Sequence, residues 1–174
     1  MEELFNAYCS DLDEPLLKAY KGHVYRVFNY AMYLLDYDET HMREIEAALV
    51  FHDLAACKME SMRYLEPSYE FLIAENDRHN WGLNAGLMIA IIEFHHKIFK
   101  FNGDHATIVN AVRSGDWIEV SFNYLTMGVP KEVIKKVAAK FPTGNFVSLI
   151  GVIGPKVSGS RIKLIQDMLH VIKI

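Results

Sequence analysis

KGHVYRVFNYAMYLLD, residues 21–36, is the stretch that decides the fold class. Its apolar residues recur at intervals of three and four, a spacing that marks one face of an amphipathic helix: Val24, Val27, Phe28, Ala31, Leu34 and Leu35. The polar sequence DYDET, residues 36–40, then ends the pattern. The region therefore predicts a helix over residues 21–36 whose apolar face packs against other elements.

Similar patterns continue along the chain and predict further helices over residues 40–54, 66–76, 80–99, 107–120, 131–140 and 161–174. Pro67 and Pro130 stand at helix starts, where proline is tolerated. FPTGNF, residues 141–146, is typical of a loop, and residues 146–153 form either part of that loop region or a short strand. The sequence predicts an all-α fold and one domain over residues 1–174.

The composition excludes several classes of protein. The net charge is −4 and the basic residues are scattered, which argues against a nucleic-acid partner. The acidic start lacks the features of a signal peptide, and the longest apolar run, residues 85–92, is too short to span a membrane. We expect a cytoplasmic protein without a membrane partner, in which Cys9 and Cys57 are reduced thiols. Whether the chain forms a homodimer is left open by the sequence.

Three predicted helices carry a side chain able to bind metal on the face that points into the core. His23 and His52 continue the apolar lines of the first two helices, and Asp116 continues that of the helix over 107–120. A buried carboxylate is costly unless it is paired or bound to a metal, and neutral imidazoles supply ligand nitrogens. A divalent cation shared by the three helices would satisfy all three side chains.

Asp53 adds a carboxylate beside His52, near the end of the same predicted helix. A mixed nitrogen and oxygen set suits Mn, Fe, Co, Ni or Zn better than Ca; Mg is also kept, and the sequence does not decide among them. Taken singly, each histidine is also explained as a hydrogen-bonded core residue, and Asp116 as a helix cap or the partner of Arg113. The four residues together favour a metal centre.

Four short stretches, in their order and spacing, resemble the HD superfamily: GHVYRVFNYA (22–31), FHDLA (51–55), EFHHKI (93–98) and RSGDWIEVS (113–121). That superfamily is defined by a His, a later His-Asp doublet and a distant Asp on a helical bundle. The resemblance covers about residues 20–125. It continues more loosely, through FPTGNF, to bacterial HD-domain phosphohydrolase-like proteins of unassigned substrate.

This resemblance implies that His23, His52, Asp53 and Asp116 bind one divalent metal. It also implies hydrolysis of a phosphate ester, on a small phosphorylated metabolite or nucleotide, by metal-activated water whose proton Asp53 accepts. A minority of the superfamily use two irons to oxidise small substrates, so an HD-type di-iron oxygenase is one alternative. A metal-binding regulatory module without turnover is another.

Two-metal members of the superfamily have further histidines between the doublet and the last Asp, and this chain offers His79, His95 and His96. Because His95 and His96 are adjacent on a predicted helix, we expect one of them to face the site while the other points elsewhere. His79 lies in a loop-like stretch. The sequence therefore favours one metal, with these histidines as candidates for a second metal or for substrate binding.

Three basic residues are candidates for binding the substrate phosphate: Arg26, Lys97 and Arg113. Each lies close in sequence to a predicted ligand, and fixed positive charge is what a phosphate needs. The alternative for the two arginines is that they pair with acidic side chains or orient the ligand carboxylates. Gly115, beside Asp116, weakens its own helix and predicts a close backbone approach to another helix or to a ligand.

Overall fold

The computed structural model describes residues 1–59 and 63–142, and the regular secondary structure in these residues is entirely helical. The prediction of an all-α fold is therefore confirmed. The helices are α1 (Glu2–Tyr8), α2 (Glu14–Leu34), α3 (Met42–Phe51), α4 (Leu54–Met59), α5 (Leu65–Arg78), α6 (Ala85–Phe94), α7 (Ala106–Val120) and α8 (Lys131–Lys140). The expected helix over 161–174 and the alternative strand over 146–153 lie outside the described residues.

Local start signals explain where α2 and α6 begin. The Asp13 side chain accepts a hydrogen bond from the backbone N–H of Leu16 at 2.8 Å, so α2 starts seven residues before the predicted position 21. The Asn84 side chain caps α6 in the same way through the N–H of Leu87, at 3.0 Å. The prediction that this helix begins at residue 80 is wrong, because Asn80 has a left-handed backbone.

The predicted helix over residues 40–54 is interrupted. α3 ends at Phe51 and α4 begins at Leu54, so His52 and Asp53 occupy a turn between two helices. Neighbouring residues on a continuous helix diverge by about 100°, which would send these two side chains apart. Here His52 Nε2 lies 3.3 Å from Asp53 Oδ2, so the two side chains converge.

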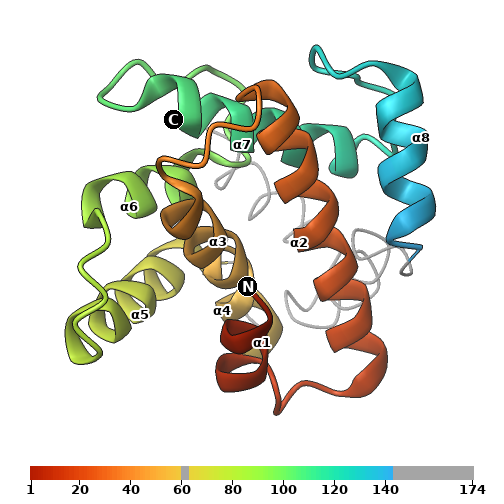
Figure 1. Cartoon of the computed structure of the whole chain (residues 1–174). Helices are drawn as coiled ribbons and strands as arrows, with labels where there is room; N and C mark the ends of the chain where they lie inside the picture. Colours follow the sequence, from red (N-terminus) through yellow and green to blue (C-terminus); the bar gives the residue numbers. More distant parts are fainter. Residues whose placement is uncertain (60–62, 143–174) are drawn as a thin grey trace.

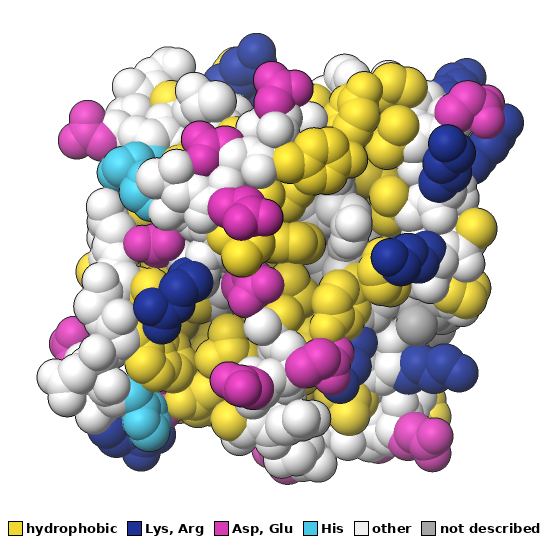
Figure 2. Space-filling view, viewed as in Figure 1, with side chains coloured by type: hydrophobic (Ala, Val, Ile, Leu, Met, Phe, Trp, Pro, Cys, Tyr) yellow, Lys and Arg dark blue, Asp and Glu magenta, His cyan; other side chains and the backbone are white. Residues whose placement is uncertain are grey.

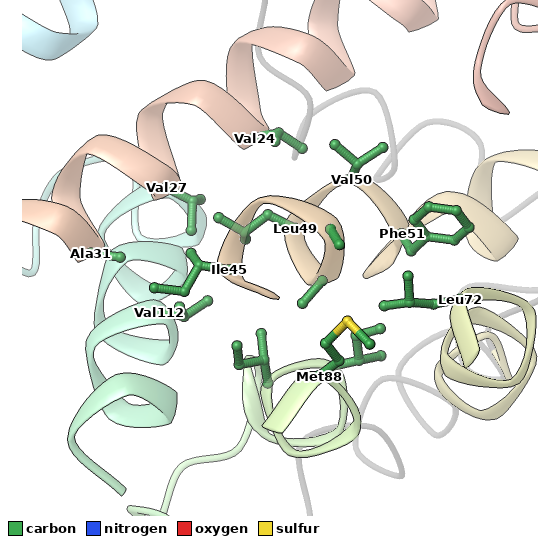
Figure 3. Close-up of a cluster of buried hydrophobic side chains, with 14 of the residues drawn as sticks. Val24, Val27, Ala31, Ile45, Leu49, Val50, Phe51, Leu72, Met88 and Val112 are labelled. Carbon is green, nitrogen blue, oxygen red and sulfur yellow. The ribbon is translucent and has the colours of Figure 1, made fainter. Parts of the chain in front are cut away.

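α2 lies in the middle of the bundle, between α3 on one side and α8 on the other, and it packs most extensively against α7 (Figure 1). α5 and α6 pack against the remaining side of α3. Buried aliphatic and aromatic side chains fill the space between these helices, as Figure 3 shows for residues of α2, α3, α5, α6 and α7: Val24, Val27, Ala31, Ile45, Leu49, Val50, Phe51, Leu72, Met88 and Val112. This core fixes the positions of the helices that carry the polar site.

Gly115 lets α7 approach α2 closely. A Cβ atom added at Gly115 would lie 2.7 Å from the backbone oxygen of Val27 and 3.4 Å from Cβ of Tyr30. Neither is the end of a flexible side chain, so a larger residue would force the two helices apart. The close approach predicted from the sequence is thus an approach to another helix, and it brings Asp116 toward His23.

We expect Gly115→Ala to lower the free energy of unfolding by about 1–2 kcal/mol, because overpacking exceeds the roughly 1 kcal/mol gained from helix propensity. Urea unfolding in the presence of a chelator measures this without any contribution from metal. The matched control is Gly86→Ala in α6, where the nearest atom to an added Cβ is Asn84 Oδ1 at 3.4 Å. A Gly115→Ala variant as stable as the Gly86→Ala variant would contradict the close approach.

The surface carries both signs of charge. On the face in Figure 2, acidic and basic side chains are interspersed among apolar ones rather than gathered in a single stripe. Among residues 1–59 and 63–142, none of the helices combines the length and the apolar character needed to cross a membrane.

Candidate metal centre

Six histidine and aspartate side chains converge where α2 and α7 pass the C-terminal ends of α3 and α6. α2 supplies His23, the turn between α3 and α4 supplies two residues, the residues after α6 supply two, and α7 supplies Asp116. The full set is His23, His52, Asp53, His95, His96 and Asp116. All are buried except His96, whose side chain is 19% exposed. Residues separated by more than 90 positions in the sequence therefore form one polar cluster inside an apolar bundle.

The first part of the cluster contains the four ligands predicted from the sequence. His23 Nε2 lies 3.1 Å from His52 Nε2 and 3.4 Å from Asp116 Oδ1. His52 Nε2 lies 3.3 Å from Asp53 Oδ2. Two neighbouring ligand atoms bound to one metal at about 2.0–2.1 Å, in tetrahedral or octahedral geometry, lie about 2.8–3.4 Å apart. The atoms of His23, His52 and Asp116 therefore fit neighbouring ligands of a single ion, whereas Asp53 groups with His52 and His95.

The second part of the cluster shares the two carboxylates. His95 Nε2 lies 3.4 Å from Asp53 Oδ1, the oxygen that does not face His52. His96 Nδ1 lies 2.7 Å from Asp116 Oδ2, the oxygen that does not face His23, and His96 Nε2 is 4.0 Å from Asp53 Oδ1. The expectation that one of the adjacent histidines points elsewhere is wrong. α6 ends at Phe94, so His95 and His96 both reach the cluster.

The tautomers of two histidines follow from backbone contacts. His52 Nδ1 lies 2.6 Å from the carbonyl oxygen of Leu49, and His95 Nδ1 lies 2.6 Å from that of Ile92. A carbonyl oxygen only accepts hydrogen bonds, so in both rings Nδ1 carries the proton and donates it. In a neutral ring Nε2 then carries a lone pair, and both Nε2 atoms point at Asp53. This is how outer contacts orient histidine ligands in metal sites.

Several buried polar atoms in the cluster form no hydrogen bond of acceptable geometry within the described part of the chain. They include Asp53 Oδ1, His95 Nε2 and both oxygens of Asp116, although Asp116 Oδ2 is close to His96. Buried polar groups are nearly always hydrogen-bonded, and a buried charge needs a partner. A cation between these lone pairs would supply that partner. The residues present therefore fit a divalent metal.

Both burial and neighbouring charges shift the pKa values of these groups. Burial raises the pKa of Asp53 and of Asp116, but the neighbouring histidines more than offset this and hold both pKa values well below the usual range. Burial, and then the charge of His96, lower the pKa of His95 to about 4. For His23, the adjacent carboxylates Asp116 and Glu119 outweigh burial and raise the pKa to about 9. Two ionised carboxylates thus face a neutral His95.

The other predicted site residues lie in different surroundings. His79 is half exposed, with its Nε2 3.4 Å from Glu75 and its ring stacked on Trp81, so the structure does not bring it to the cluster. Arg26 donates to Glu119 and to the backbone oxygen of Phe141. These contacts match the sequence alternative in which this arginine pairs with an acidic side chain.

Arg113 also has backbone partners. Its Nη1 donates to the carbonyl oxygens of Lys97 and Ile98, at 3.0 and 3.3 Å, and Trp117 Nε1 donates to the same oxygen of Lys97 at 3.2 Å. These bonds tie the segment that follows His96 to α7, one turn from Asp116. Arg113 therefore helps to hold the two halves of the cluster together, while Lys97 directly follows the histidine pair.

Two residues near the cluster were not predicted. Tyr64 is buried, its ring centroid lies 6.4 Å from that of His95, and burial followed by the charges of Asp53 and Asp116 raises its pKa well above the usual value. Nothing in the sequence around Tyr64 indicates this position. Glu119 lies 3.7 Å from His23, and its place three residues after Asp116 was a usable signal because i and i+3 share a helix face.

Comparison of the chain with known proteins found no matching family model, no matching curated sequence and no matching solved structure. The function is therefore inferred from the motifs of the sequence, the helical fold and the geometry of the cluster.

Proposed function

We propose that this chain is a metal-dependent phosphohydrolase of the HD superfamily, acting on a small phosphorylated metabolite or nucleotide. One observation carries the proposal: the Nε2 atoms of His52 and His95, whose Nδ1 atoms face backbone carbonyls, lie 3.3 and 3.4 Å from the two oxygens of the buried Asp53 carboxylate. Electron pairs that face each other in a buried site repel unless a cation lies among them. His23 and Asp116 complete a ligand set of mixed nitrogen and oxygen atoms.

A divalent cation in such a site lowers the pKa of a bound water and polarises a phosphoryl oxygen. The chain contributes the surroundings of that chemistry. Asp53 stays ionised and offers an oxygen toward His95, where it can orient a water molecule and take its proton. Tyr64 keeps its hydroxyl proton and can donate a hydrogen bond to the Asp53 carboxylate, which helps to orient it.

Of the three basic residues predicted to bind phosphate, we retain Lys97 for this role. It directly follows His96, at the half-buried edge of the cluster where the exposed fraction of His96 indicates access from solvent. Arg26 contacts Glu119, and Arg113 donates to backbone carbonyl oxygens of the segment after His96. Their proposed role is to fix the ligand-bearing segments.

Hydrolysis is tested by measuring release of inorganic phosphate from a panel of phosphomonoesters and nucleotides. Tag-free protein would be stripped of metal and reloaded separately with Mn, Fe, Co, Ni, Zn or Mg. We expect release with at least one metal and none with the stripped protein. If every metal form is inactive on the whole panel, the assignment as a phosphohydrolase fails. Sustained turnover would exclude a binding module that only holds its ligand.

A di-iron oxygenase is a second candidate, and a specific observation favours it. His95 and His96 both reach the cluster. Asp53 and Asp116 each direct one oxygen to the first part of the cluster and the other oxygen to the second part. The six side chains together could hold two ions, which would supply oxidative chemistry there. Binding of about two irons per chain under anaerobic conditions, with oxygen consumption on addition of a substrate, would support this function. One iron per chain under iron-replete conditions would exclude it.

A further inference from the structure

Glu119 places a buried carboxylate behind the ligand His23. It lies on α7, one turn after Asp116, and its side chain is only 8% exposed. Glu119 Oε2 is 3.7 Å from His23 Nδ1, the ring nitrogen that faces away from the cluster. The other nitrogen, Nε2, faces His52 and Asp116. His23 is therefore held between the cluster on one side and a second carboxylate on the other.

Arg26 fixes that carboxylate in place. Its Nε and Nη2 lie 2.8 and 2.7 Å from Glu119 Oε2, a two-point contact that sets both position and orientation. Its Nη1 donates to the backbone oxygen of Phe141, at 2.7 Å. Because Arg26 is one turn after His23 on α2, the arginine, the glutamate and the histidine join α2 to α7 at the site.

Only one ring nitrogen of a neutral histidine can bind a metal, and the other then carries the proton. In His23 the Nε2 atom faces the cluster, so the proton must stand on Nδ1, toward Glu119. We propose that Glu119 is a positioning residue: its negative charge keeps the Nδ1 proton of His23 in place and makes Nε2 a stronger ligand. This role rests on the metal centre of the proposed function but not on the reaction performed there.

The test compares metal affinities, measured by competition with a coloured chelator using Zn and Mn as the probes. Glu119→Gln alone would leave the charge of Arg26 buried without its partner, so the main variant is Arg26→Gln combined with Glu119→Gln. We expect its affinity to be about 10- to 100-fold weaker than that of the wild type. Glu132→Gln, which breaks an exposed pair with Lys135, is the surface control and should bind as the wild type does.

A purely structural role is separated from positioning by two further measurements. Urea unfolding in the presence of a chelator should give a cooperative transition, which shows that the metal-free double variant is folded. Glu119→Asp keeps the charge near His23 and should recover most of the affinity. If Glu119→Asp is as weak as the double variant, packing rather than charge sets the affinity, and the proposal is overturned.

The remaining outcomes distinguish the two proposals. If the metal affinity of the double variant is within twofold of that of the wild type, the role of Glu119 is overturned and the metal centre stands. If the wild type binds neither Zn nor Mn, the centre itself is absent, and both the role of Glu119 and the proposed function are lost.

Discussion

Asp53→Asn lowers kcat/KM for phosphate release by about 10³-fold in the metal-loaded enzyme, the loss expected when a charged group that stabilises the reacting centre and accepts a proton is removed. Asn keeps the shape of the side chain but removes its charge. The amide also offers one oxygen in place of the two that face His52 and His95, at 3.3 and 3.4 Å. The measurement is a comparison of kcat/KM for the best substrate of the panel, at saturating metal.

The matched control is Asp11→Asn, the same chemical change in a side chain that is mostly exposed and pairs with Lys58 on the surface. Surface pairs of this kind contribute little to stability, so this variant should keep full activity. Circular dichroism of both variants would show that the helices are intact. Wild-type kcat/KM in Asp53→Asn would contradict the role of Asp53 and the mechanism that depends on it.

Removal of metal is the second large effect that we expect. An ion held by residues from several helices binds the folded chain and not the unfolded one, so it stabilises the fold by mass action. At a free metal concentration about 1,000 times Kd this amounts to about 4 kcal/mol. In a chain of this length 1 kcal/mol shifts Tm by about 2–4 °C, so chelation should lower Tm by about 10 °C.

Asp116→Ala provides the control for the chelation experiment. This variant lacks a carboxylate that contacts His23 and His96, so its Tm should hardly respond to either chelator or added metal. Differential scanning fluorimetry measures both proteins with and without chelator. Equal Tm values for the wild type in both conditions would favour the alternative in which the buried histidines are ordinary core residues.

Helical periodicity was enough to predict the fold class, because the apolar faces of α2, α3 and α7 are continuous in the sequence. The same periodicity placed His23, His52 and Asp116 on inward faces, where the structure finds them. Helix boundaries were predicted less well. The start of α2 depends on a single capping side chain, and the short α1 and α4 were not predicted at all.

Contacts between helices could not be derived from the sequence. The positions of His95 and His96 depend on α6 ending at Phe94, which periodicity in an almost uniformly apolar segment does not indicate. Arg26 and Glu119 are 93 positions apart, and their pairing depends on how α2 crosses α7. That crossing in turn requires the absence of a side chain at Gly115.

The most direct test of the metal centre is the metal content per chain, measured by elemental analysis on tag-free wild type beside Asp116→Ala. We predict about one divalent ion per wild-type chain and less than about a tenth of that in the variant, since one lost ligand typically removes most of the affinity. About two irons per chain would keep the centre and favour the oxygenase. No metal in the wild type, even after anaerobic reconstitution with each candidate ion, would contradict the account.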